Sequence, residues 1–429
     1  MNDTEYAATA RHLASRLASL AVFDSAGRPT WVGDEVDPHQ APDADPPRLV
    51  TGPLDDGLLT GRAGIAVALA GCSTLPGASS SWSMLARRTM VLALDRPAPR
   101  LGGLGWQSGD LGIARAAGLV GRLLEDPQLV LAGRSLARRA VTALQADPSL
   151  CPNYPDLLDG EAGHLAAVLS ADLPEAFEGV RRQVATNLVE RIAGRARRDA
   201  RGASWLMAGF APSVVGMAHG GSGIALALSA ARAVGIGDDE LVDEALRWED
   251  GLFATAQGGW PDLRVADPVP ALAWCHGAPG VGISAALRSG LVKDPRAVIA
   301  FTRASQASAA HRPRDAAFDG TLCHGLSGVV ELHLAGAEAW PDAAPEHLRA
   351  ARLTARHLTR AGQDGHPPWV CGVRGGRTPN VLVGLAGVAI TTLRCHDPAI
   401  LPALTHPGRP SVGAVGSVGA AGLAGAIRS

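Results

Sequence analysis

The chain has 429 residues, and 47% of them are hydrophobic, which is enough for a large buried core. Its formal net charge is −2, so neither nucleic acid nor an anionic membrane surface is indicated as a partner. No continuous apolar run of about 20 residues occurs, so no integral membrane segment is expected. The N-terminus lacks the basic and then apolar layout of a signal peptide, and we expect a cytoplasmic protein.

A short glycine motif recurs seven times along the chain. Each copy reads Gly-x-x-Gly followed by a run of Ala, Val or Leu, and successive copies are 48 to 60 residues apart. One copy would carry no information, but seven at similar spacing indicate a repeat architecture. The first glycines of the copies are Gly61, Gly109, Gly160, Gly220, Gly277, Gly325 and Gly384.

The run after each motif predicts a helix that is apolar on most faces and therefore buried. Amphipathic segments lie between these runs, and three clear examples in chain order are 129–144, 241–256 and 346–358. Helix start signals support the amphipathic elements, since Asp126 precedes a proline at the first helical position, as does Asp294. No alternation typical of a strand is sustained anywhere in the sequence.

One buried and one amphipathic helix per repeat predict about fourteen helices and an all-α fold class. Such repeats form either an open solenoid or a closed ring. The apolar inner helices favour the ring, a seven-repeat α/α toroid. We expect a single toroid domain over residues 1–405, with an irregular loop over 25–56. The Gly/Ala-rich tail, 406–429, is expected to be loose or partly docked.

The residues just before each first glycine take matching positions in a ring, so they should meet at one mouth. Polar and metal-ligating types occupy these positions from the second to the sixth repeat. In chain order the residues directly before the glycine are Thr60, Ser108, Asp159, His219, His276, His324 and Val383. The residues one position earlier are Leu59, Gln107, Leu158, Ala218, Cys275, Cys323 and Leu382.

Cys275, Cys323 and His324 can form a zinc site. Thiolate and imidazole suit zinc, and three protein ligands leave a fourth position open, as in catalytic sites. The alternative is that these cysteines are simply small buried residues. Cys-His-Gly stands at the same register in two adjacent repeats, which favours the metal. The cysteines do not suggest a disulfide framework, because six are too few for a chain of this length.

Two further histidines and an acidic segment have open roles. His219 and His276 could each be a ligand, an acid/base group or a donor that orients a ligand, or each could bond only to backbone. Asp159 holds the same position as the histidines, and Asp156 lies three residues before it. A carboxylate here could orient a histidine or supply a proton, but helix capping is the favoured explanation from these residues alone.

The sequence motifs that contain these residues resemble those of the lanthionine synthetase C-like family, the zinc cyclases of lanthipeptide biosynthesis. The resemblance covers roughly residues 50–395, and its most specific parts are WCHGAPG over 274–280 and CHG over 323–325. WCHGAPG is most similar to the cyclase domains of fused lanthipeptide synthetases. The chain is too short for an additional dehydratase domain, so the resemblance implies a free-standing cyclase.

The resemblance also assigns roles to single residues. It implies zinc on Cys275, Cys323 and His324, with His219 as the active-site histidine. It implies Asp156 as the active-site aspartate, and on that ground alone Asp156 ranks above its neighbour at position 159.

Two positions depart from the family pattern. His276 stands where other members have a tyrosine after the first zinc cysteine. Ala271 stands where the family often has an arginine, four residues before that cysteine. The nearest upstream substitute is Arg264, and the group that would stabilise an anionic intermediate is left open by this departure.

The implied activity is intramolecular Michael addition of peptide cysteine thiols to dehydroalanine or dehydrobutyrine, which forms lanthionine or methyllanthionine rings. The substrate would be a dehydrated precursor peptide, supplied by a separate dehydratase of the lyase or kinase-like kind. His219 is the expected acid, supported by Asp156 and His276. Zn²⁺ is the expected cofactor, and no nucleotide is required.

Three alternatives remain open from the sequence. The chain could add glutathione to dehydroamino acids, or it could be a non-catalytic scaffold that holds a metal and binds peptides. It could also be a glycosidase on an α/α toroid, which needs two carboxylates across a cleft. Three acidic residues lie close together in one segment, namely Asp156, Asp159 and Glu161. The sequence shows no clear second carboxylate that would face them across a cleft.

Overall fold

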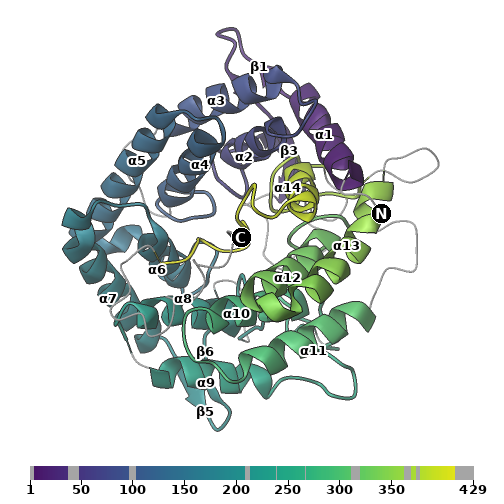
Figure 1. Ribbon diagram of the computed structural model, residues 1–429. Coiled ribbons are helices and arrows are strands. Elements are labelled where there is room, and N and C mark those ends of the chain that lie inside the picture. Colours follow the sequence, from purple (N-terminus) through teal and green to yellow (C-terminus); the bar gives the residue numbers. More distant parts are fainter. Residues whose placement is uncertain are drawn as a thin grey trace, which may run out of the picture.

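The computed structural model describes residues 4–36, 48–95, 103–207, 213–237, 239–265, 267–310, 319–361, 369–372 and 377–410. Within these residues fourteen α-helices form a closed double ring (Figure 1). The predicted all-α toroid is confirmed. In the described part of the chain, no helix is long and apolar enough to cross a membrane.

Seven helices form the inner ring, and each begins one residue after the first glycine of a motif. Nearly all of their residues are buried, as the apolar runs predict. They are α2 (Arg62–Ser73), α4 (Asp110–Leu123), α6 (Glu161–Ser170), α8 (Gly221–Ala233), α10 (Ala278–Ser289), α12 (Leu326–Ala339) and α14 (Leu385–His396).

The amphipathic helices form the outer ring. The first helix, α1, packs on α14, and α14 also packs on α2, so the two ends of the repeat array meet and exclude an open solenoid. The outer helices are α1 (Thr4–Ser19), α3 (Ser80–Leu94), α5 (Pro127–Ala146), α7 (Glu178–Gly194), α9 (Asp239–Asp250), α11 (Ala297–Ala310) and α13 (Ala344–Arg360). Short 3₁₀ turns are η1 (Pro148–Leu150), η2 (Glu175–Phe177) and η3 (Pro341–Ala343).

Six short strands form three antiparallel ribbons in the described residues. The ribbons are β1 (Val22–Phe23) with β2 (Pro29–Thr30), β3 (Val32–Val36) with β4 (Leu49–Pro53), and β5 (Arg197–Asp199) with β6 (Gly202–Ser204).

Part of the segment 25–56 therefore differs from the irregular loop that its Pro and Asp content predicted. The register of β3 and β4 pairs Val32 with Pro53 and Val36 with Leu49. Pro53 stands at the end of its strand, where a missing backbone donor is tolerated. The ribbon is also tied to a distant loop, since the backbone N–H of Asp34 donates to the Arg377 carbonyl at 2.8 Å. Residues 37–47 lie outside the described residues.

The second glycine of each motif is required by a close backbone contact. A Cβ at Gly112 would lie 1.9 Å from the Trp106 carbonyl oxygen, and one at Gly223 would lie 1.9 Å from that of Met217. In all seven repeats the contacted carbonyl belongs to the residue six positions earlier, at 1.9 to 2.6 Å. Only glycine permits this approach, which folds the preceding loop over the start of its helix.

The loops that precede the inner helices are joined to each other by backbone hydrogen bonds. Trp274 N–H donates to the Cys323 carbonyl at 2.8 Å, and Cys323 N–H donates to Leu382 at 2.9 Å. Leu382 N–H in turn donates to Leu59 at 2.9 Å, so the last repeat is joined to the first. These bonds bring the residues before each glycine together at one end of the ring.

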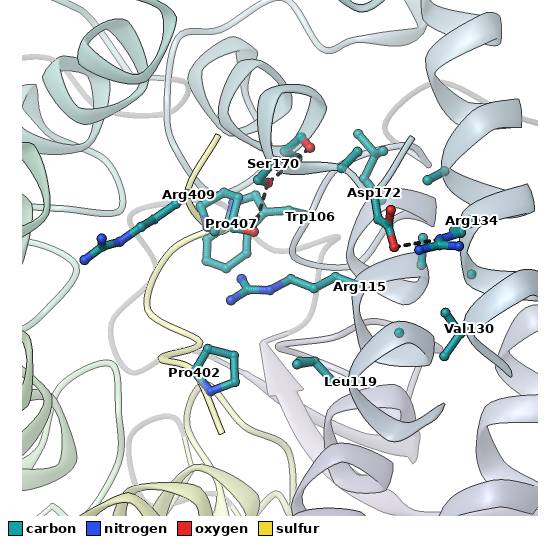
Figure 2. Close-up of a pocket in the computed structure, with 18 of the residues that line it drawn as sticks. Trp106, Arg115, Leu119, Val130, Arg134, Ser170, Asp172, Pro402, Pro407 and Arg409 are labelled. Atoms are coloured by element: carbon teal, nitrogen blue, oxygen red, sulfur yellow. Dashed lines mark hydrogen bonds and ion pairs between the residues drawn. The ribbon is translucent and has the colours of Figure 1, made fainter. Parts of the chain in front are cut away.

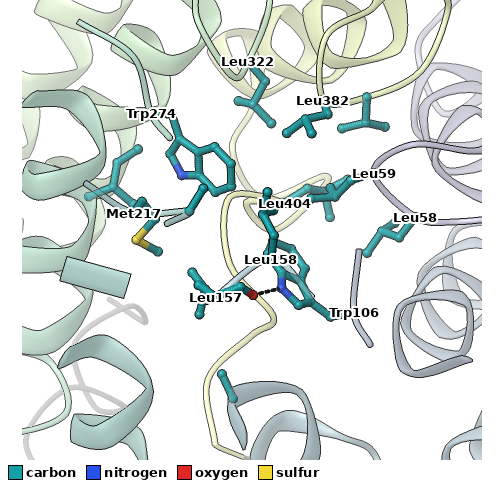
Figure 3. Packing of buried hydrophobic residues seen from close by; sticks show 14 of the residues in the cluster. Leu58, Leu59, Trp106, Leu157, Leu158, Met217, Trp274, Leu322, Leu382 and Leu404 are labelled. Carbon is teal, nitrogen blue, oxygen red and sulfur yellow. Dashed lines mark hydrogen bonds between the residues drawn. The ribbon is translucent and has the colours of Figure 1, made fainter. Parts of the chain in front are cut away.

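An apolar cluster fills the centre of the ring beside these loops (Figure 3). Its members stand three residues before each first glycine, and each is at most 3% exposed. They are Leu58, Trp106, Leu157, Met217, Trp274, Leu322 and Val381. Leu404, which follows the last helix by eight residues, lies among them in Figure 3.

The chain after α14 runs back into the ring. Arg394 donates to the Leu401 carbonyl, Arg115 donates to the Ala403 carbonyl at 2.8 Å, and Ser170 donates to the Pro407 carbonyl at 3.0 Å. Arg394 and Ser170 lie at the ends of their helices, so this segment fills the ring from the side where the inner helices finish. The described part of the predicted tail, 406–410, is docked, and 411–429 lie outside the described residues.

Candidate active site

The three predicted metal ligands lie together. One ligand atom from each of Cys275, Cys323 and His324 falls within 4.8 Å of the others. Cys323 Sγ is 3.4 Å from Nε2 of His324, although the two residues are neighbours in the chain. Both cysteines are buried and His324 is exposed, so the cluster has one accessible side.

The local fold explains this convergence. Cys275 precedes α10 and Cys323 precedes α12, and the hydrogen bond from Trp274 N–H to the Cys323 carbonyl holds the two loops side by side. A turn before α12 aims both Cys323 and His324 at the same point. In that turn the Asp319 carboxylate accepts from Thr321 N–H at 2.7 Å, and the Thr321 hydroxyl accepts from His324 N–H at 3.3 Å.

The donor set fits a zinc ion. Zinc bonds are about 2.3 Å to sulfur and about 2.0–2.1 Å to nitrogen, so a sulfur and a nitrogen on one tetrahedral ion stand about 3.6 Å apart. The 3.4 Å between Cys323 and His324 is close to this value. Three ligands of this kind leave one coordination position for a substrate atom.

The two thiols share a proton. A hydrogen bond with Cys323 holds the pKa of Cys275 well below its ordinary value, and His276 and His324 also favour the Cys275 thiolate. The same hydrogen bond, together with burial, raises the pKa of Cys323 well above its ordinary value. The pair therefore carries a negative charge that a bound cation would neutralise.

His219 and Asp156 form a hydrogen-bonded pair beside this cluster. His219 Nδ1 is 2.8 Å from Asp156 Oδ2. The other oxygen of Asp156 accepts from the backbone N–H groups of Asp159 at 3.1 Å and Gly160 at 2.9 Å, at the start of α6. Asp156 thus fixes the turn that precedes α6 and orients the histidine, whereas Gly160, the N-cap residue of α6, has no side-chain cap.

His276 connects the pair to the cysteines. Its ring stacks on that of His219, with centroids 4.8 Å apart and an interplanar angle of 23°. Its side chain also bonds to the Cys275 sulfur, and it is only 4% exposed. Burial lowers the pKa of His276, so the neutral imidazole is favoured in this position.

Arg264 lies near the two sulfurs. A side-chain hydrogen bond with Asp262 raises the pKa of Arg264, and the charges of Cys275 and Cys323 raise it further. The guanidinium contacts both oxygens of Asp262, at 2.8 and 2.7 Å. The Arg264 side chain thus brings positive charge to the site, although it comes from a different position than Ala271.

Sequence reasoning missed Glu249 of α9. Its carboxylate is 2% exposed and accepts from Gly216 N–H at 2.9 Å and from the Ser222 hydroxyl at 2.8 Å. Gly216 has a φ of +103°, and a Cβ there would lie 2.7 Å from the Cys275 carbonyl oxygen. Glu249 therefore ties the loop that carries His219, and the start of α8, to outer helix α9. The sequence did carry a signal for a buried carboxylate, since Glu249 falls four residues after buried Ala245 and so lies on the same inward face of α9.

A separate cavity of about 250 Å³ lies between the C-terminal segment and the helices α4, α5 and α6 (Figure 2). It is lined by Trp106, Arg115 and Arg409, and an ion pair of 2.7 Å joins Arg134 to Asp172 at its edge. None of the predicted site residues lines it.

Comparison with known proteins agrees with this geometry. The family model described as lanthionine synthetase C-like protein matches residues 52–405. The chain belongs to the lanthionine synthetase C-like family.

A solved structure shows the same fold as this chain. Nisin cyclase superposes with a TM-score of 0.56 and 16% sequence identity, over 80% of this chain and 89% of that chain. A more distant match is the GH76A α-1,6-mannanase of Salegentibacter sp. HEL1_6, with a TM-score of 0.43 and 15% identity, over 70% of this chain and 90% of that chain. The search of curated proteins gives no significant match.

Proposed function

We propose that the chain is a zinc-dependent lanthipeptide cyclase. In this reaction a cysteine thiol of a dehydrated precursor peptide adds to a dehydroalanine or dehydrobutyrine of the same peptide. The observation that carries the proposal is the stacking of His219 on His276, because it sets an acid/base pair beside a cluster of metal-ligand type. A separate dehydratase would have to supply the substrate.

Bound by Cys275, Cys323 and His324, zinc would lower the pKa of the incoming thiol so that thiolate is present near neutral pH. The thiolate forms a C–S bond at the β-carbon, and the alkene electron pair moves to the carbonyl oxygen. His219 then protonates the α-carbon, which restores the carbonyl. Because sulfur loses one proton and carbon gains one, the reaction needs no net proton and no redox partner.

Asp156 and Arg264 would assist this proton transfer in different ways. Asp156 accepts from Nδ1 of His219, which fixes the ring and directs Nε2 as the nitrogen that exchanges a proton with substrate. Arg264 would stabilise the negative charge on the carbonyl oxygen, the role that Ala271 cannot perform.

A direct assay tests the function. Zinc-loaded protein is incubated with a synthetic peptide that contains one dehydroalanine and one cysteine. We expect loss of the free thiol without a change in mass, because cyclisation is an isomerisation, and fragmentation should locate a thioether. Persistence of the thiol would contradict the proposal. A mass gain of one glutathione, when glutathione is added, would favour the scavenging alternative.

Replacement of Arg264 tests its part in charge stabilisation. We expect Arg264→Ala to lower kcat about 100-fold with little change in zinc content, and Arg264→Lys to recover part of the loss. Arg201→Ala is a matched control, because Arg201 pairs with Asp199 in the same two-residue spacing but lies on the β5–β6 ribbon. Equal kcat for Arg264→Ala and the control would exclude this role.

A further inference from the structure

A second carboxyl and imidazole lie behind the Asp156–His219 pair. Asp159 occupies, in the third repeat, the position that histidines occupy in the next three repeats, and His164 lies five residues later on α6. The Oδ1 atom of Asp159 and the Nε2 atom of His164 are both buried, and neither has a hydrogen-bond partner among the residues that the structure describes. Buried polar atoms without partners are rare and call for a physical explanation.

Gly105 shows that these two atoms border one small space. A Cβ added at Gly105 would lie 3.1 Å from Asp159 Oδ1, 3.3 Å from His164 Cε1 and 3.8 Å from His164 Nε2. The side chains of the third repeat therefore face the loop of the second repeat at Gly105, which has no side chain. A space bordered by two polar atoms suits a single bridging water molecule.

The hydrogen-bonding roles of the two groups are complementary. His164 Nδ1 is 2.9 Å from the Gly160 carbonyl oxygen, which can only accept, so Nδ1 carries the hydrogen and Nε2 is an acceptor. Burial lowers the pKa of His164 to about 4, which keeps the ring neutral. Burial and then Asp156 raise the pKa of Asp159 to about 7. Near neutral pH the Asp159 carboxyl is therefore a donor for part of the time.

The charged neighbours of this pair come from several elements. Asp156 and Asp55 act on Asp159 in the same direction as burial, and His219 opposes them. Arg191 of α7 favours the neutral form of His164. Asp159, a group of intermediate proton affinity, therefore lies within electrostatic range of His219.

We propose that Asp159 and His164, bridged by one water molecule, store a proton for His219. The proposal rests on the proposed cyclase function, in which the thiol releases its proton before the α-carbon accepts one. The Asp159 carboxylate takes that proton by way of His219, and its O–H then donates through the water to His164 Nε2. After His219 has protonated the α-carbon, Asp159 returns the proton to His219, so the cycle conserves protons. Asp159 acts through His219 and is a positioning residue.

The first test needs no substrate. Burial raises the pKa of Glu249 to about 7 as well, so carboxyl-carbon NMR of the zinc-loaded protein should show two carboxyls that titrate near pH 7. Only the Asp159 signal should vanish in Asp159→Asn. In Gly105→Ala the new methyl group would occupy the space between the two groups, and loss of the hydrogen bond to His164 should lower that midpoint by at least one pH unit. Gly290→Ala is the control, because a Cβ there meets only the Leu287 carbonyl, at 3.7 Å.

The second test is kinetic. Asp159→Asn should lower kcat about tenfold and flatten its dependence on pH around 7, with zinc content unchanged. Gly105→Ala removes no ionisable group, and it should shift the inflection of the kcat profile to lower pH by the same amount as the NMR midpoint. If the signal that Asp159→Asn removes does not titrate near pH 7, or if Asp159→Asn keeps the kcat profile of the wild type, the proton store is excluded. Absence of cyclisation by the wild type would refute the proposed function instead, and the titration would still decide whether the pair exists.

Discussion

Replacement of Cys323 by alanine should remove the metal and the cyclisation activity together. Cys323 is one of three protein donors, and its loss leaves Cys275 and His324 as a two-ligand site, which holds zinc far more weakly. We expect bound zinc to fall from one equivalent per chain to less than about a tenth after dialysis, and kcat to fall at least about 1,000-fold. Elemental analysis and the thiol-loss assay measure the two effects on the same samples.

Cys395→Ala is the matched control for this experiment. Cys395 is also buried, at 2% exposure, but it lies near the end of α14, away from the loops that carry the cluster. The control should keep its zinc and its activity. A Cys323→Ala protein that retains a full equivalent of zinc would show that the zinc binds elsewhere.

Replacement of His219 by alanine should separate chemistry from metal binding. His219 is paired with Asp156 rather than with either cysteine, so its loss should leave zinc content unchanged. The α-carbon would then have to be protonated by water, and we expect kcat to fall by about 10² to 10⁴. The measurement is single-turnover cyclisation at saturating peptide, with zinc determined in parallel.

Asp156→Asn refines the same prediction. Asparagine can still accept from the backbone N–H groups of the turn that precedes α6, so this turn is retained while the charge beside His219 is lost. We expect a loss of about 100-fold in kcat with an unchanged melting temperature. His347→Ala, on outer helix α13, is the control. If His219→Ala cyclises peptide at the wild-type rate, another group is the acid.

The sequence predicts the inner ring well because its signal is strong and local. Gly-x-x-Gly marks a backbone contact that only glycine allows, as Gly112 and Gly223 show, so the start of every inner helix could be read directly. The sequence did not predict that α1 closes the ring, because this helix precedes the first motif and packs on the last repeat. The β3–β4 ribbon was missed because its one proline, Pro53, lies at a strand end, where it does not interrupt pairing.

The sequence predicted some residues of the candidate site and missed others. Matching positions in successive repeats were enough to bring Cys275, Cys323 and His324 together. The same logic placed Asp159, not Asp156, among the histidines, and only the family resemblance ranked Asp156 first. The structure shows why the residues alone could not decide, since one oxygen of Asp156 accepts from the turn before α6 while the other holds His219. Glu249 acts from an outer helix, so no repeat position points to it.

X-ray absorption at the zinc edge of the purified wild-type protein tests the metal centre most directly. Two sulfur and one nitrogen ligand from the chain predict two scatterers at about 2.3 Å and lighter atoms at about 2.0–2.1 Å, with one zinc per chain. Addition of a thiol peptide should raise the sulfur count to three as the open position fills. A protein that takes up no zinc, or a spectrum with only nitrogen and oxygen neighbours, would contradict the proposed centre.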